Sequence, residues 1–153
     1  MKLRLPNDQL AVLRDALQRA GTKEIGGQMY GEQLAPSDFC VTELTLQKRP
    51  GTFARFIVDL LQATRDALRF FEQTHHQYTR YNYIGEWHSH PSFERVPSST
   101  DVAAMRDVVS DPEFKGSFAV LMITRLDDDQ MTCSGWLFDP AGREFPIAVE
   151  QQL

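Results

Sequence analysis

Residues 85–91 of this 153-residue chain read Gly-Glu-Trp-His-Ser-His-Pro, and Ser98 and Asp101 follow shortly after. The stretch is predicted to end a β-strand, so His88 and His90, two residues apart, place their side chains on the same side. Their Cα atoms then lie about 7 Å apart. Imidazoles at that spacing can reach one metal ion with bonds of about 2.0–2.1 Å, so the stretch predicts a metal site.

Asp101 is the third ligand in this prediction. A catalytic zinc takes three protein ligands and keeps a fourth position for water. Asp101 falls in the first turn of a helix that follows the loop over 91–100, where the helix dipole favours an anion. The pattern His-x-His-x7-Ser-x2-Asp is expected by chance in about 4 of 10,000 chains of this composition. A surface histidine pair beside an ordinary helix cap is therefore the weaker explanation.

The rest of the chain predicts helices and strands in alternation. Helices are predicted over 8–20, with Gly21 as its stop, over 59–77, and after the loop that ends at Thr100. In the helix over 59–77, the buried stripe is expected to contain Leu60, Leu61, Leu68 and Phe71. The predicted strands cover 24–34, 39–46, 81–88, 118–123, 131–138 and 144–149. This order predicts a single α/β domain over 1–153, built around a central sheet.

Composition limits the partners that the chain can have. It carries 16 Lys and Arg against 21 Asp and Glu, so its formal net charge is −5. Nucleic-acid surfaces need clustered cations that neutralise phosphates, so no nucleic-acid partner is expected. Two cysteines make no disulfide framework, no secretory signal is visible, and the longest apolar run is far shorter than the ~20 residues that span a bilayer. We therefore expect a cytoplasmic protein with no membrane partner.

Several of these positions together resemble the motif of the JAMM zinc metallopeptidases, also called MPN+ or JAB domains. The resemblance is carried by a glutamate ahead of a double glycine, two histidines, a serine and an aspartate, namely Glu24, Gly26-Gly27, His88, His90, Ser98 and Asp101. It implies a three-layer α/β/α fold around a curved mixed β-sheet, similar to that of cytidine deaminases. All five functional positions of the motif are intact, with their spacings.

The same resemblance implies the roles of these residues. One Zn²⁺ per chain would be held by His88, His90 and Asp101. Glu24 would be the general base, and Ser98 would steady the oxyanion.

The family's chemistry implies the substrate class. Its members hydrolyse isopeptide or peptide bonds at the C-terminus of ubiquitin or ubiquitin-like proteins. The chain is similar to bacterial members, some of which are encoded in antiphage operons of the CBASS type beside E1- and E2-like conjugation enzymes. We therefore expect deconjugation or precursor processing of a ubiquitin-like protein, with trimming of a sulfur-carrier protein as the alternative.

Two assignments stay open from the residues alone. Glu86 lies two residues before His88, so strand alternation places it on the ligand side, where it competes with Glu24 as the base; the family pattern favours Glu24. Gly26 and Gly27 allow another backbone to approach closely, either a substrate tail added as a strand or an ordinary bulge.

Trp87 points away from the ligand side and is expected in the core.

Three other classes compete with a peptidase. A non-catalytic MPN scaffold has lost one or more ligands, whereas this chain keeps them all. The related DNA-repair branch carries Asn between its histidines, where this chain has Ser89, and the acidic charge disfavours DNA. A zinc deaminase needs His-x-Glu and Pro-Cys-x-x-Cys, which the chain lacks.

Overall fold

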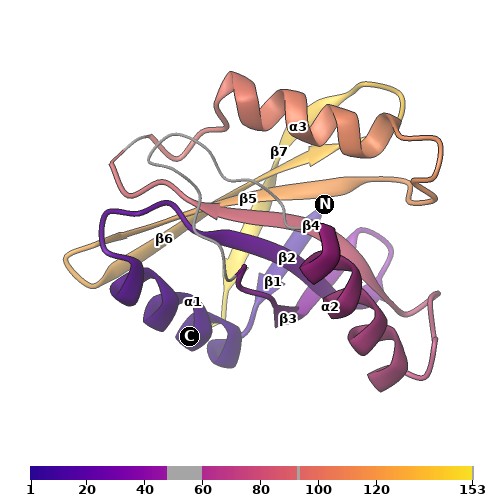
Figure 1. Ribbon diagram of the computed structural model, residues 1–153, viewed down its shortest axis with the longest axis horizontal. Helices are drawn as coiled ribbons and strands as arrows, with labels where there is room; N and C mark the ends of the chain where they lie inside the picture. Colours follow the sequence, from indigo (N-terminus) through magenta and orange to yellow (C-terminus); the bar gives the residue numbers. More distant parts are fainter. Residues whose placement is uncertain (48–59, 93, 153) are drawn as a thin grey trace.

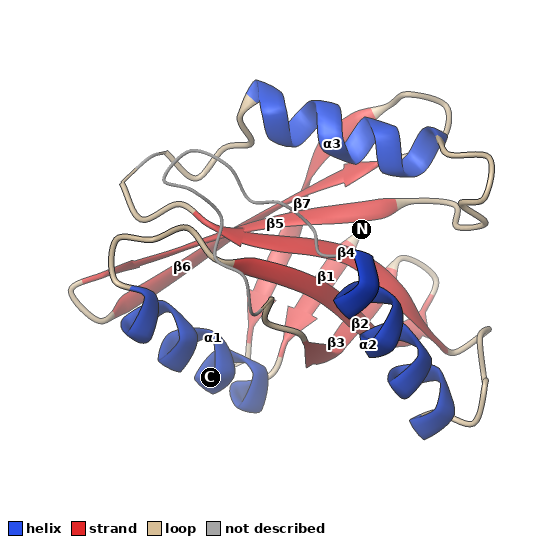
Figure 2. Cartoon of the chain, viewed as in Figure 1, coloured by secondary structure: helices blue, strands red, loops and turns tan. Residues whose placement is uncertain are grey.

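The computed structural model describes residues 1–47, 60–92 and 94–152. The elements follow in the order β1 (Lys2–Leu5), α1 (Asn7–Ala20), β2 (Gly26–Ala35), β3 (Asp38–Leu44), α2 (Leu60–Gln73), β4 (Tyr81–Ser89), α3 (Ser99–Ser110), β5 (Ala119–Asp127), β6 (Gln130–Phe138) and β7 (Glu144–Gln151). The predicted mixed α/β class is confirmed, since the described part of the chain has three helices around one sheet (Figure 2). The start of the helix predicted over 59–77 lies outside the described residues. None of the described helices has the length and apolar character that a membrane crossing requires.

The seven strands form one sheet in the order β1-β3-β2-β4-β5-β6-β7, which closes into a barrel. Closure depends on β1, which pairs in parallel with both β3 and β7. The expected three-layer arrangement is therefore met only in part, because one face of the sheet is the inside of a barrel. The four-residue β1 makes this possible, since its alternating Leu3 and Leu5 are fully buried while its backbone joins the two outer strands.

Two hydrophobic clusters lie on opposite faces of the sheet. The first takes residues from every strand and from α1, and the second lies under α3; Figure 1 shows these helices on opposite sides of the sheet. Strand β5 contributes to both clusters because its side chains alternate, with Val120 and Met122 in the first and Leu121 and Ile123 in the second. The predicted strand buried on both faces is thus confirmed.

The buried stripe predicted for the second helix is wrong at Leu61 and Leu68, whereas Phe71 is partly buried and packs on Tyr30. The side chain of Leu60 lies outside the described part of the chain. Leu61 and Leu68 are 72% and 61% exposed, and the buried side of α2 carries Ala63 and Phe70 instead. Phe70 packs on Tyr30 of β2, with ring centroids 4.8 Å apart. This aromatic contact sets the rotation of the helix, because large rings remove more apolar area from water than the leucines would.

An ion pair helps to hold β1 against β3. Arg4 donates from Nε to Asp38 Oδ1 at 2.8 Å and from Nη2 to Asp38 Oδ2 at 2.6 Å. Hydrogen bonding to the Arg4 guanidinium holds the pKa of the Asp38 carboxyl below its ordinary value of 3.8. The folded state then binds this proton more weakly than the unfolded chain. The pair therefore stabilises the fold above about pH 3.8, and the stabilisation is lost as the pH falls through the folded-state pKa.

We expect Asp38→Asn to lower the thermal midpoint at neutral pH and to lose this effect in acid. The difference between wild type and Asp38→Asn should stay nearly constant from about pH 7 down to about pH 5 and shrink as the pH falls below about 3.8. It should also shrink in high salt. Thermal denaturation followed by circular dichroism measures it. Asp15→Asn is the control, because the Asp15–Arg19 pair lies on one exposed face of α1. A difference that is constant with pH would contradict the assignment.

Candidate functional site

The end of β4 carries the predicted histidine ligands. Strand β4 runs antiparallel to β2 and parallel to β5, and His88 pairs with Gly26 on one side and Ile123 on the other. The His90 amide donates to the Thr124 carbonyl oxygen at 2.9 Å, which continues the pairing beyond the strand. Both histidines are 6% exposed. Their imidazoles therefore stand on a rigid backbone between two neighbouring strands.

Asp101 lies between the two imidazoles. Its Oδ1 is 3.3 Å from His88 Nδ1, and its Oδ2 is 3.5 Å from His90 Nε2. The structure thus brings together the three side chains that the sequence predicts as ligands, although Asp101 comes from α3 and the histidines from the end of β4.

Ser98 caps the helix that supplies Asp101. Its Oγ accepts from the Asp101 amide at 3.1 Å, and its own amide donates to Asp101 Oδ2 at 2.7 Å, which together form a capping box. The hydroxyl also donates to Asp101 Oδ2 at 2.7 Å. A hydroxyl has one hydrogen, so Ser98 must rotate away from Asp101 before it can donate to an oxyanion.

Each imidazole has its other nitrogen beside a second acceptor. His90 Nδ1 donates to the Glu94 carbonyl oxygen at 2.9 Å, and His88 Nε2 lies 3.6 Å from Glu86 Oε2. The His90 contact is a hydrogen bond, whereas the Glu86–His88 contact is at ion-pair distance and slightly longer than a hydrogen bond. Ligand histidines usually donate the second N–H to such an acceptor, which fixes the orientation of the ring. The Glu94 carbonyl was not predicted, because every residue has a backbone carbonyl and the residue type does not indicate which one accepts a hydrogen bond.

The carboxylates and imidazoles shift each other's pKa values. Burial by itself would lower the pKa of His88, but hydrogen bonds to Asp101 and Glu86 outweigh it and raise the value to about 9. Burial would raise the pKa of Asp101, but hydrogen bonds from His88 and His90 hold it far below its ordinary value. The cluster therefore favours a negative Asp101 between two positive or hydrogen-bonding rings.

Glu24 lies two residues before β2, near enough to interact electrostatically with His88, His90 and Asp101. The adjacent Ile25 is clamped to β4, since Ser89 N donates to the Ile25 carbonyl at 2.8 Å and Ile25 N donates to Ser89 Oγ at 2.9 Å. Burial raises the pKa of Glu24, the two imidazoles offset part of the rise, and Asp101 adds to it. A carboxyl with a raised pKa is better suited to accept and return a proton near neutral pH. Ser89, the residue between the histidines, was not singled out as a clamp because its role depends on the paired strand.

The glycine pair has an intramolecular explanation. A Cβ on Gly27 would lie 1.9 Å from the Thr45 carbonyl oxygen, so only glycine fits there. Thr45 and Gln47 donate backbone hydrogen bonds of 3.0 Å to this segment of β2, and β4 pairs with its other edge. Among the described residues, a substrate tail would find no vacant strand edge at Gly26-Gly27. The expected substrate role of Gly26 and Gly27 therefore gains no support from the structure.

Across the described ranges, no group of three or more His, Cys, Asp or Glu side chains is arranged so that it could hold a metal ion. The Asp101 oxygens instead face the imidazole nitrogens directly. The donor atoms nevertheless have the type that zinc prefers. The two distances, 3.3 and 3.5 Å, run from the imidazoles to different oxygens of Asp101. These residues therefore suit zinc by donor type, and binding would need Asp101 to turn one oxygen away from direct contact with the rings.

Comparison with known families matches residues 6–137 to Prok-JAB, the prokaryotic homologs of the JAB domain. The chain belongs to this family. The matched segment of this Prok-JAB chain includes all residues of the candidate site, and the JAB resemblance predicted from the motif is confirmed. The solution structure of protein DSY2949 from Desulfitobacterium hafniense is similar, with a TM-score of 0.68 and 17% identity over 98% of this chain and 92% of that one. That likeness shows the fold alone, and no curated protein matches the chain.

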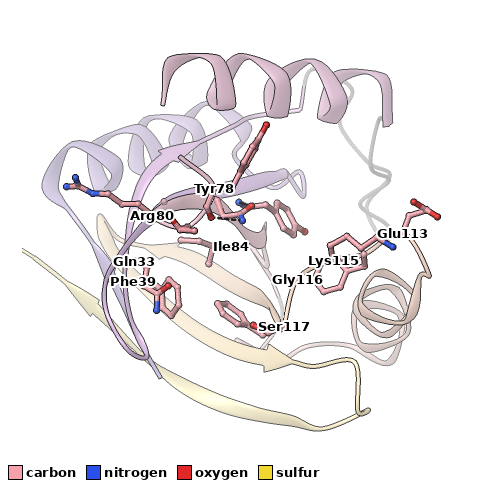
Figure 3. Close-up of a pocket in the computed structure, with 15 residues that line it drawn as sticks. Gln33, Phe39, Tyr78, Arg80, Ile84, Glu113, Lys115, Gly116 and Ser117 are labelled. Carbon is pink, nitrogen blue, oxygen red and sulfur yellow. Dashed lines mark hydrogen bonds between the residues drawn. The ribbon is translucent and has the colours of Figure 1, made fainter. Parts of the chain in front are cut away.

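A separate cavity lies at the opposite end of β4. It has a volume of about 420 Å³, and Figure 3 shows Phe39, Ile84 and Arg80 among its lining residues. Residues 82–84 at the start of β4 line it, whereas the histidines stand at the end of that strand. The cavity is therefore not part of the candidate site.

We expect Ser98→Ala to lower the free energy of unfolding by about 1 kcal/mol, because α3 loses its N-terminal cap. Ser99→Ala, one residue into the helix, is the matched control and should change stability much less. Urea denaturation of both variants measures the difference. Equal effects of the two substitutions would contradict the capping role.

Proposed function

We propose that this Prok-JAB chain is a zinc-dependent peptidase or isopeptidase that cleaves after the C-terminus of a ubiquitin-like protein. The observation that carries the proposal is the close approach of Asp101 to His88 and His90, with Glu24 near enough to interact electrostatically with all three. Hydrolases occur in the JAB-like family, and two imidazoles with one carboxylate are donor types that zinc prefers. Zinc, when bound, lowers the pKa of a water molecule towards ~7 and polarises the scissile carbonyl.

The residues of the chain have separate tasks in this reaction. His88, His90 and Asp101 would hold the zinc ion. Glu24 takes a proton from the attacking water as its oxygen adds to the carbonyl carbon, and returns it to the leaving amine as the C–N bond breaks. Ser98, rotated away from Asp101, donates its hydroxyl hydrogen to the oxyanion.

The geometry supports Glu24 rather than Glu86 as the base. Glu86 and Asp101 lie beside opposite nitrogens of the His88 ring, so the ring stands between them. Glu86 is also 6% exposed, whereas Glu24 is only half-buried. A base must reach both solvent-derived water and the leaving group, and the more exposed Glu24, two residues before β2, suits this better than the buried Glu86.

The partner and setting belong to the same proposal. A ubiquitin-like protein or its conjugate is the substrate, with E1- and E2-like enzymes as associated proteins in a cytoplasmic antiviral system. Trimming of a sulfur-carrier protein is the alternative for the same chemistry. A non-catalytic MPN module is the second candidate, and the observation that favours it is that no group of His, Cys, Asp or Glu among the described residues is arranged to hold a metal ion.

We expect the purified chain to bind about one zinc per molecule and to cleave a C-terminal amide fusion of a ubiquitin-like protein encoded by a neighbouring gene. A chelator should abolish cleavage, and added zinc should restore it. Glu24→Gln should keep zinc and lose activity by about 10²–10⁴-fold. Metal content by mass spectrometry and cleavage on gels measure both effects.

Glu113→Gln is the control, because Glu113 lines the cavity at the other end of β4. Cleavage that survives the chelator would refute the mechanism. An active Glu24→Gln beside an inactive Glu86→Gln would transfer the role of base to Glu86. Absence of zinc from the purified wild type, with no cleavage after zinc is added, would favour the non-catalytic module.

A further inference from the structure

Glu86 is a buried carboxylate that the proposed reaction does not use. It lies in the middle of the sheet, where β4 pairs with Gln28 of β2 and Leu121 of β5. A carboxylate that is only 6% exposed is costly unless a positive or hydrogen-donating partner compensates for the lost water. Its presence at this position therefore calls for a partner within the protein.

The His88 ring lies at ion-pair distance from this carboxylate and can serve as the partner. Glu86 Oε2 lies 3.6 Å from His88 Nε2, and both residues stand on the same face of β4 because they are two apart. Its charge acts in the same buried region on Tyr83, whose pKa is raised by burial first and by Glu86 second. The carboxylate and the ring thus share a region from which water is largely excluded.

The two histidines are oriented in different ways. His90 donates from Nδ1 to a backbone carbonyl, which any residue at position 94 would supply. His88 instead has a side-chain carboxylate at its Nε2, and its Nδ1 faces Asp101. The orientation of His88 consequently depends on the type of one residue, which makes it testable by substitution.

We propose that Glu86 is a positioning residue for His88, accepting its Nε2–H and thereby directing Nδ1 towards Asp101 and the ligand position. This inference depends on the proposed function in one respect: the position towards which His88 Nδ1 is directed is the one proposed for zinc. Strand β4 supports this role, since Glu86 and His88 are two residues apart on a backbone paired on both sides. At this position the Glu86 carboxylate fixes the orientation of the His88 imidazole and does not itself contact the substrate.

Zinc affinity, measured by competition with a chromogenic chelator at fixed pH, tests the role. Glu86→Ala should weaken zinc binding by about 10–100-fold, and Glu86→Gln should weaken it less, because the amide oxygen still accepts a hydrogen bond. Glu32→Gln is the matched control, since Glu32 is a strand glutamate paired with Arg80 away from the histidines. It should bind zinc as the wild type does.

Nitrogen-15 NMR of the metal-free protein gives a second readout that needs no zinc. The His88 Nε2–H resonance should move in Glu86→Gln, while the His90 Nδ1–H resonance and the backbone amide spectrum stay in place. Glu86→Gln keeps the size of the side chain, so it decides the question even if Glu86→Ala does not fold. Wild-type zinc affinity together with an unmoved His88 resonance would overturn the proposal. If the wild type binds no zinc and the resonance still moves, the proposed function fails but the positioning role stands.

Discussion

The Asp101 carboxylate accepts hydrogen bonds from Ser98 at the start of α3 and lies between the imidazoles of His88 and His90. One side chain therefore joins the helix end to the strand end, and the candidate site depends on it. Because charge-assisted hydrogen bonds are stronger than neutral ones, this carboxylate keeps its negative charge despite partial burial. The same charge is what a metal ligand needs.

Rigidity around this carboxylate comes from the sheet. The end of β4 is paired on both sides. The two hydrogen bonds between Ser89 and Ile25 also hold it to the segment just before β2, which contains Glu24. Because β1 closes the barrel, these central strands cannot easily move relative to their neighbours. A site built on paired strands holds its side chains more accurately than one built on loops. The helix α3 follows β4 in the chain, and its first turn places Asp101 against the histidines.

Sequence patterns predicted the order of helices and strands well, because most of them bury one clear face. The pattern failed for α2, where Leu61 and Leu68 have the spacing of a buried stripe but are exposed. The Phe70–Tyr30 contact sets that helix, and no local pattern could predict it, since Tyr30 lies 40 residues earlier in the chain. Barrel closure was missed for a related reason: β1 is too short to show a period and joins β3 and β7 by long-range pairing.

The residue types and spacings of the motif were enough to name the ligand candidates and to propose zinc chemistry, because His-x-His alternation and a Ser-x-x-Asp helix start are local geometry. Contacts between distant segments settled the rest. They placed Thr45 against Gly27, which gives Gly27 a packing role, and placed Glu86 and the Glu94 carbonyl behind the two rings. Local rules state which way a side chain points from its strand, but which atoms it meets depends on how the sheet is paired and closed.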